Sequence, residues 1–355
     1  MTKAGETKVQ NSLLLKSLRG EAIDRYPVWL MRQAGRYMAE YRAVRERISF
    51  LDLCRNPELC AEVMQTAVEK IGVDAAIIFS DLLPILQPMG FDLEYRQGDG
   101  PVISNPFREE GDLTRVIELN DASPMSYVFE TVRATCHAMP EIPVIGFAGA
   151  PFTLAGYAIE GRGGTSFHQT RALMYGRPDL WHEFMGRLTR TIALYVNEQI
   201  AAGAAVIQLF DSWVGVLGPQ AFRDFVLPWC RELLRLITPG TPVIYFGTGN
   251  PELLNDFVAT GAAGIGLDWR ADLACACRTV PNSIAIQGNL DPAILLADEM
   301  TVRHETQALL RKVTRRTGYI FNLGHGVLKE TPVENVQALV RTVKEVGREQ
   351  CARLL

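Results

Sequence analysis

Residues 143–149 (PVIGFAG), 204–211 (AAVIQLFD) and 242–247 (PVIYFG) are short apolar runs rich in β-branched residues, and each ends at a glycine or a carboxylate. Five more runs of this kind occur at 26–31 (YPVWLM), 74–80 (DAAIIFS), 264–268 (GIGLD), 283–289 (SIAIQGN) and 319–323 (YIFNL). Most of these runs lack the alternation of apolar and polar residues seen in strands with one solvent-facing side. They therefore predict parallel strands that are buried on both faces.

Helical patterns lie between these runs. Asn56 can cap a helix whose first residue is Pro57, apolar residues then recur every four positions from Leu59, and Gly72 ends the pattern. Similar helices are predicted at 179–202, 219–237 and 331–346. Strand and helix alternate eight times, which favours an α/β fold of the (β/α)8 TIM-barrel type over an open sheet.

The gap between the second and third predicted strands is long. It holds a hairpin pattern at 91–104 (FDLEYRQGDGPVIS), with the turn at Asp99–Gly100, and a helical pattern near 124–138. We therefore expect a hairpin-containing insertion after the second strand. No repeat or linker divides the chain, so residues 1–355 are expected to form one domain, with about residues 1–20 as a loosely ordered N-terminal segment.

The composition excludes several classes of partner. The 355 residues include 36 basic and 40 acidic ones, so the net charge of -4 gives no electrostatic case for binding nucleic acid or an anionic membrane. Seven cysteines without a C-x-x-C motif suggest buried thiols in a reducing compartment, not disulfides or a zinc ribbon. The leucine run at 13–15 is too short for a signal peptide, and no apolar stretch approaches the roughly 18 residues of a membrane helix. A cytoplasmic location is expected.

Residues that follow the strands are the candidates for an active site, because this fold places its sites at the carboxyl ends of the strands. Arg32 and Arg36 follow the first strand. On a helical turn their guanidinium groups would share one face and grip several carboxylates; the alternative is a solvated basic turn. Asp81 follows the second strand among apolar residues. A carboxylate there is costly unless it is paired or meets a ligand, although a helix cap or a structural ion pair would also satisfy it.

Other strand ends add hydroxyl groups and an imidazole. Tyr157 ends the glycine-rich stretch 149–157, which lacks the G-x-x-x-x-G-K-S/T motif of a phosphate-binding loop; phosphate binding stays an alternative. The Tyr157 hydroxyl is a candidate ligand contact, and the alternative is a core tyrosine. Ser212 follows the fourth strand and His325 the last; with Asp211 they form a catalytic triad on paper, but no nucleophile-elbow sequence surrounds Ser212. The sequence 247–249 (GTG) lacks the third glycine of a dinucleotide fingerprint. The residues that follow the strands contain no cluster of metal ligands.

Six segments in this order resemble the uroporphyrinogen decarboxylase family from one end of the chain to the other. They are 27–42 (PVWLMRQAGRYMAEYR), 77–90 (IIFSDLLPILQPMG), 146–161 (GFAGAPFTLAGYAIEG), 208–215 (QLFDSWVG), 287–292 (QGNLDP) and 321–327 (FNLGHGV). The resemblance implies a distorted (β/α)8 barrel that forms a homodimer with facing clefts. It also implies a lyase without cofactors that removes four CO2 from the acetate side chains of uroporphyrinogen III, giving coproporphyrinogen III in heme and porphyrin biosynthesis.

The resemblance also implies the residues of the site. The positions that match the family's substrate-binding residues are Arg32, Gln33, Ala34, Gly35, Arg36, Asp81, Tyr157, Ser212 and His325. Asp81 matches the central catalytic carboxylate, and catalytic roles are also expected for Arg32, Arg36, Tyr157 and His325. Phe50 is a weaker match to a residue that lines the cleft. The group that delivers the proton stays open between a protonated Asp81 and a water, because arginine is a poor acid at neutral pH.

Two alternatives compete with this interpretation. Zinc-dependent methyltransferases, which the family resembles in fold, need a His-x-Cys pair near the fifth strand and a further cysteine near the last. This chain has 246–249 (FGTG) and 322–325 (NLGH) at those places, so the thiolates are missing. The other alternative is a barrel that binds tetrapyrroles without catalysis, which a measurement of CO2 release from uroporphyrinogen would distinguish.

Overall fold

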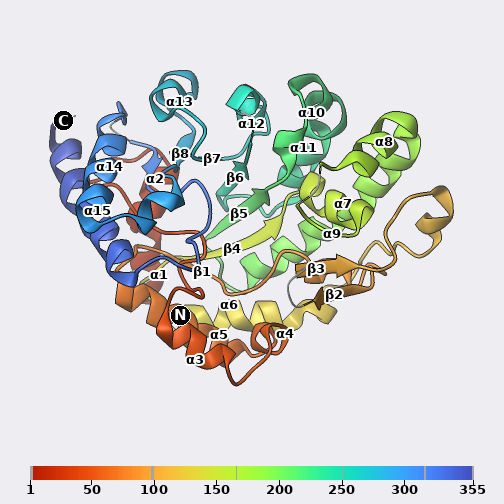
Figure 1. Ribbon diagram of the computed structural model, residues 1–355, viewed down its shortest axis with the longest axis horizontal. Coiled ribbons are helices and arrows are strands. Elements are labelled where there is room, and N and C mark those ends of the chain that lie inside the picture. Colours follow the sequence, from red (N-terminus) through yellow and green to blue (C-terminus); the bar gives the residue numbers. More distant parts are fainter. Residues whose placement is uncertain (1–2, 97–99, 165, 250, 316, 354–355) are drawn as a thin grey trace.

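A curved parallel sheet lies at the centre of the computed structural model, which describes residues 3–96, 100–164, 166–249, 251–315 and 317–353. Within these residues the sheet has seven strands in the order β1–β4–β5–β6–β7–β8–β9 (Figure 1). They are β1 (Ala76–Ile77), β4 (Val144–Gly149), β5 (Val206–Asp211), β6 (Val243–Gly247), β7 (Gly264–Leu267), β8 (Ala285–Gln287) and β9 (Tyr319–Ile320). All neighbouring pairs are parallel, and the strands are buried on both faces, as the apolar runs predicted.

The prediction of a first strand at 26–31 is wrong. This segment is not a regular strand: Val28 forms one parallel bridge with Phe321, and the Val28 carbonyl accepts a hydrogen bond from the Asp74 N–H at 2.8 Å. Pro27 has no N–H to donate, and the Val28 N–H donates to the Asp74 carboxylate at 2.9 Å instead of to a strand. The segment thus lies between β9 and the residues before β1. The curled sheet is consistent with a TIM-type barrel.

Helices surround the sheet (Figure 1). They are α1 (Lys3–Gln10), α2 (Leu13–Leu18), α3 (Ala39–Arg45), α4 (Phe50–Cys54), α5 (Pro57–Ile71), α6 (Ser126–Ala138), α7 (Pro151–Glu160), α8 (His168–Gly176), α9 (Pro178–Ala201), α10 (Pro219–Phe225), α11 (Leu227–Leu236), α12 (Leu254–Val258), α13 (Leu273–Thr279), α14 (Glu299–Arg311) and α15 (Val333–Arg353). In the described residues, no helix is both long and apolar enough to cross a bilayer.

Short 3-10 turns complete the list of helical elements. They are η1 (Pro84–Leu86), η2 (Glu110–Thr114), η3 (Ser123–Met125), η4 (Val214–Val216), η5 (Pro251–Leu253) and η6 (Pro292–Leu296).

Two helix predictions had different outcomes. For α5 the prediction is confirmed: the Asn56 side chain accepts a hydrogen bond from the Leu59 N–H at 3.1 Å, and the helix ends at Gly72 with φ 73°. The single helix predicted at 219–237 is wrong, because α10 and α11 are separate helices that meet at Val226. Pro228 explains the break, since it lacks an N–H and its ring excludes a continuous helix.

The N-terminal residues also differ from the loosely ordered segment that we expected. Residues 3–18 form α1 and α2, and the side chains of Leu14, Leu15 and Leu18 are buried. The Ser17 hydroxyl donates to the Tyr319 carbonyl at 3.4 Å, which ties α2 to β9. Leu14, Leu15 and Leu18 are therefore part of the core, and burying them offsets the entropy lost in ordering the segment.

A two-stranded antiparallel ribbon, β2 (Leu93–Arg96) and β3 (Gly100–Ile103), lies in the chain between β1 and β4. Leu93 pairs with Ile103, and Tyr95 pairs with Pro101. The turn that we predicted at Asp99–Gly100 involves residues 97–99, which lie outside the described residues. The ribbon brings residues of β2 and β3 to the edge of the site described below.

Candidate active site

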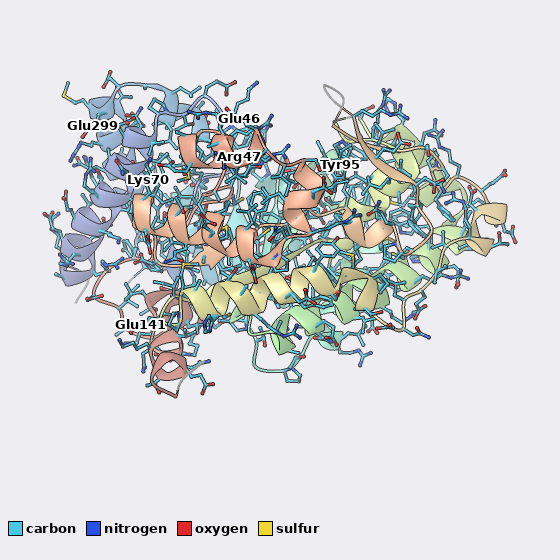
Figure 2. The ribbon with its side chains drawn as sticks, turned by 90° about the horizontal axis from the view of Figure 1, so that it is seen from below. Glu46, Arg47, Lys70, Tyr95, Glu141 and Glu299 are labelled. Carbon is cyan, nitrogen blue, oxygen red and sulfur yellow. The ribbon has the colours of Figure 1, made fainter. Side chains whose placement is uncertain are left out.

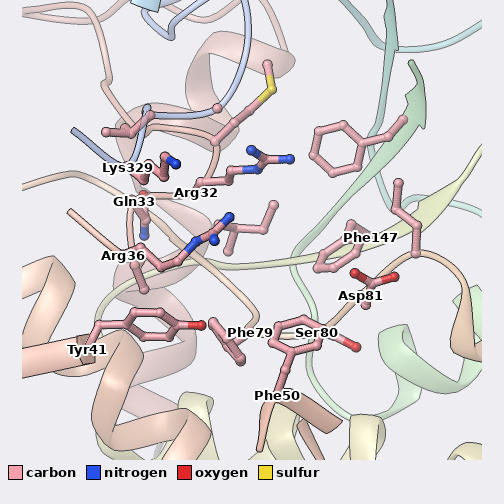
Figure 3. A pocket seen from close by; sticks show the side chains of 18 of the residues that line it. Arg32, Gln33, Arg36, Tyr41, Phe50, Phe79, Ser80, Asp81, Phe147 and Lys329 are labelled. Carbon is pink, nitrogen blue, oxygen red and sulfur yellow. The ribbon is translucent and has the colours of Figure 1, made fainter. Parts of the chain in front are cut away.

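A cavity of about 1360 Å³ lies at the carboxyl ends of the strands. Its walls come from residues 31–36, from α3 and α4, and from residues that follow β1, β5 and β9. It is larger than most small-molecule pockets, which have volumes of about 300–1000 Å³. Figure 3 shows the guanidinium groups of Arg32 and Arg36 on one side of this cavity and the Asp81 carboxylate on the other.

Arg32 and Arg36 are both exposed, and both line the cavity. Among the residues described, neither has a carboxylate within ion-pair distance. The segment is a turn and not the helical one considered from sequence, because Arg32 has a left-handed backbone with φ 59° and the next helix begins at Ala39. The turn still directs both cations to one cavity.

The Gln33 side chain is buried, unlike those of Arg32 and Arg36. It is fully buried, and its side-chain amide bonds to the backbone: Oε1 accepts from the Leu30 N–H at 3.2 Å, and Nε2 donates to the Ala75 carbonyl at 3.0 Å. The Tyr37 hydroxyl donates to the Gln33 carbonyl at 2.6 Å. Gln33 therefore fixes the turn that carries the two arginines. Ala34 and Gly35 complete this wall of the cavity.

Asp81 is half-buried just after β1. Its Oδ1 atom accepts two hydrogen bonds, from the Leu83 N–H at 3.0 Å and from the Tyr95 hydroxyl at 2.7 Å. In the described part of the chain no cation pairs with Asp81, and its Oδ2 atom accepts no hydrogen bond. The structural ion pair considered from sequence is therefore not observed. The carboxylate keeps one oxygen for a ligand.

His325 and Ser212 face the same cavity. The Gly326 N–H donates to His325 Nδ1 at 2.8 Å, so the ring proton lies on Nε2. Burial, and secondarily the nearby charge of Arg32, lower the pKa of His325 to about 4. At neutral pH the imidazole is therefore uncharged and can donate a hydrogen bond from Nε2.

Asp211 does not take part in a triad with Ser212 and His325. Its carboxylate is fully buried and accepts hydrogen bonds from the Thr153 hydroxyl at 2.6 Å and the Tyr245 hydroxyl at 2.5 Å. Burial raises its pKa to about 6. These contacts occupy both oxygens, so the triad that can be written from sequence is not formed.

Tyr157 and Phe50 differ in their position relative to the cavity. Tyr157 is half-buried beside the cavity, where its ring packs against Trp213 with 5.9 Å between centroids, and it is not among the lining residues. Phe50 lines the cavity and lies 6.0 Å from the Phe79 ring, measured between centroids.

Several cavity residues were missed in the sequence. Arg45, Tyr95 and Lys329 line the cavity, as do the uncharged side chains of Tyr41 and Ser80. Arg45 lies over the Phe50 ring at 5.7 Å and donates to the Ile48 carbonyl at 2.5 Å, while Lys329 lies 3.3 Å from the Glu330 carboxylate. Tyr41, Arg45, Tyr95 and Lys329 lie within α3, the ribbon or a loop, where neither spacing nor a strand end marked them. Ser80 ends the predicted strand 74–80, but only the next residue, Asp81, was selected there.

The cavity contains no cysteine among its lining residues. Cys275 is exposed and the other six cysteines are buried. In the residues that the structure describes, no three histidine, cysteine, aspartate or glutamate side chains are grouped so that they could hold a metal ion.

Comparison with known proteins shows the family to which this chain belongs. A family model described as uroporphyrinogen decarboxylase matches residues 9–346. The chain belongs to the uroporphyrinogen decarboxylase family. It is 46% identical to a uroporphyrinogen decarboxylase of Koribacter versatilis, over 94% of this chain and 96% of the relative. It is 44% identical to that of Carboxydothermus hydrogenoformans (97% and 99% covered) and 45% identical to that of Thermus thermophilus (95% and 98% covered).

Membership in this family confirms the resemblance stated from sequence and makes the chain a carboxy-lyase. Among solved structures, a methyltransferase from Methanosarcina mazei is similar with a TM-score of 0.79 and 21% identity, covering 94% of this chain and 98% of that one. A putative vitamin-B12-independent methionine synthase from Listeria monocytogenes is similar with a TM-score of 0.58 and 11% identity, covering 90% and 96%. At these identities the likeness shows a shared fold only.

Proposed function

We propose that this chain converts uroporphyrinogen III to coproporphyrinogen III, and that Asp81 acts as counter-ion to a protonated pyrrole ring. The observation that carries the proposal is one cavity with Arg32 and Arg36 on one side and Asp81 on the other. Among the described residues, the two arginines have no ion-pair partner and only one oxygen of Asp81 accepts hydrogen bonds. The substrate has the complementary pattern: eight peripheral carboxylates and four inward-facing pyrrole N–H groups.

Binding follows from these charges. The forked guanidinium groups of Arg32 and Arg36 can each hold a carboxylate of the substrate, because no carboxylate in the described residues competes for them. Ser212 and the Nε2–H of His325 supply uncharged donors to further side chains. Because Gln33 is bonded to the scaffold, we propose that residues 33–35 contact the substrate through their backbone. Tyr157, beside the cavity, remains a predicted contact.

The chemistry uses the substrate's own ring as electron sink. Protonation of the pyrrole carbon next to nitrogen gives an iminium-like cation. The bond between the acetate methylene and its carboxylate then breaks, CO2 leaves, and the electron pair forms an exocyclic C=C bond while the ring nitrogen becomes neutral. A proton added to the exocyclic carbon gives the methyl group, and the ring carbon loses its proton. In sum, each acetate takes up one proton and releases one CO2.

Asp81 contributes electrostatics to this sequence. Its Oδ2, which accepts no hydrogen bond from the residues that the structure describes, can accept hydrogen bonds from pyrrole N–H groups. Its charge stabilises the ring cation in a site with apolar walls such as Phe79 and Phe147 (Figure 3). Arg32 and Arg36 would set which acetate is presented, since positioning alone can contribute several kcal/mol.

The assay is anaerobic incubation of the purified chain with uroporphyrinogen III, with quantification of CO2 and of the products by their number of carboxylates. We expect four CO2 for each macrocycle without any added cofactor. Absence of CO2 release would refute the activity. Stoichiometric zinc, with loss of activity on chelation, would favour the methyltransferase alternative.

We further propose, on the family resemblance, that the chain is a homodimer located in the cytoplasm. Light scattering after size exclusion tests the dimer, and a mass equal to one chain of 39.4 kDa would refute it.

A further inference from the structure

Tyr95 connects the antiparallel ribbon to the proposed catalytic carboxylate. Its hydroxyl donates to Asp81 Oδ1 at 2.7 Å, although the residue belongs to β2 and Asp81 follows β1. Neither the mechanism above nor the sequence assigned it a role. Figure 2 shows Tyr95 on the same side of the molecule as Glu46 and Arg47, which follow α3.

The ring of Tyr95 is held in place by aromatic packing. It is half-buried and lies 5.6 Å from the Phe50 ring, measured between centroids, and Phe50 in turn lies 6.0 Å from Phe79. Burial and the neighbouring Asp81 charge raise the pKa of Tyr95 far above its usual range, so the hydroxyl stays protonated. A neutral hydroxyl beside an acceptor-only carboxylate has one role in that contact, which is to donate.

The two oxygens of the Asp81 carboxylate differ in their hydrogen bonds. A carboxylate has about four lone-pair sites, two on each oxygen. The Leu83 N–H and the Tyr95 hydroxyl occupy those of Oδ1, while Oδ2 accepts no hydrogen bond within the described residues. The two sites of Oδ2 then match two pyrrole N–H donors.

We infer that Tyr95 is a positioning residue for the decarboxylation: it fixes Asp81 through Oδ1 so that Oδ2 faces two pyrrole N–H groups. The inference rests on the proposed role of Asp81. Arg96, Gly100 and Pro101 also line the cavity, so the ribbon forms a wall of the site.

The test is Tyr95→Phe, which removes the hydroxyl and keeps the ring that packs on Phe50. We expect kcat to fall about tenfold, which corresponds to about 1.4 kcal/mol at 25 °C. KM should stay within about twofold, because the arginines that grip the peripheral carboxylates are unchanged. A purely structural role would instead lower the melting temperature or the folded fraction and leave kcat for each folded molecule as in the parent.

Tyr127→Phe is the matched control. Tyr127 is half-buried, does not line the cavity, and its hydroxyl contacts Met125 Sδ at 3.7 Å, so its loss should leave kcat unchanged. A folded Tyr95→Phe variant with kcat within twofold of the parent would overturn the inference. If Tyr95→Phe fails to fold, Tyr95→Met, which also lacks a donor, replaces it; failure of both to fold would show a structural role and overturn it as well.

Asp81→Asn, measured in the same series, separates the two proposals. If Asp81→Asn is inactive and Tyr95→Phe is as fast as the parent, the positioning role alone is wrong. If Asp81→Asn turns over normally, the role proposed for Asp81 is wrong, and the positioning role is lost with it.

Discussion

Replacing Gly326 by alanine should weaken substrate binding by displacing Arg32. An ideal Cβ atom on Gly326 would lie 2.7 Å from Arg32 Cγ and 2.9 Å from Arg32 Nε, and closer still to Cδ. Non-bonded carbon atoms need about 3.5–4 Å. The Arg32 side chain must therefore leave its position, since the obstacle is a flexible exposed chain and not the backbone. Gly326 is not at a positive φ, so alanine adds no backbone strain.

The magnitude follows from the contact that is lost. A hydrogen bond to a charged group contributes about 1.5–3 kcal/mol, so losing the Arg32 grip on one carboxylate should lower kcat/KM about 10- to 100-fold, mainly through KM. The free energy of unfolding should change by less than about 1 kcal/mol, because only an exposed side chain moves.

Initial rates with uroporphyrinogen III, combined with a double-mutant cycle, make the test specific. If alanine at 326 acts only through Arg32, then adding Gly326→Ala to Arg32→Ala should cause little further loss. Gly176→Ala is the control, because a Cβ there would meet no atom within 4 Å. A Gly326→Ala variant with unchanged KM, or effects of the two changes that simply add, would refute the reasoning.

Three further predictions concern the same cavity. Asp81→Asn should lower kcat at least about 100-fold while the chain stays folded, as rates and circular dichroism would show; near-normal turnover would contradict it. Arg36→Ala should raise KM about tenfold with little change in kcat, and an unchanged KM would argue against the clamp. The pKa of His325, about 4, lies below the ordinary value near 6.5, so the unfolded chain binds a proton that the folded chain does not. As pH falls from about 6.5 to 4, the parent should therefore lose about 1–3 kcal/mol more stability than His325→Gln in urea unfolding, and equal losses would refute this.

The sequence by itself determined the fold class and the residues with the strongest chemical signals. Doubly buried strands have nearly continuous apolar runs, so the runs at 143–149 and 204–211 could be recognised without long-range information. Arg32, Asp81 and His325 could be found because each follows a predicted strand, and parallel strands bring their carboxyl ends to one edge. Arg32 lies at that edge although the segment before it forms only a single bridge and not a regular strand.

Tertiary structure decided what each of these side chains contacts. The N-terminal leucines are ordered because β9 and its neighbours cover them, and Asp211 is excluded from a triad because Thr153 and Tyr245 occupy its oxygens. Tyr95 reaches Asp81 through pairing of β2 with β3 and packing on Phe50. Such contacts join residues far apart in the chain, and their partners depend on how the backbone closes in space, which local residue patterns do not encode.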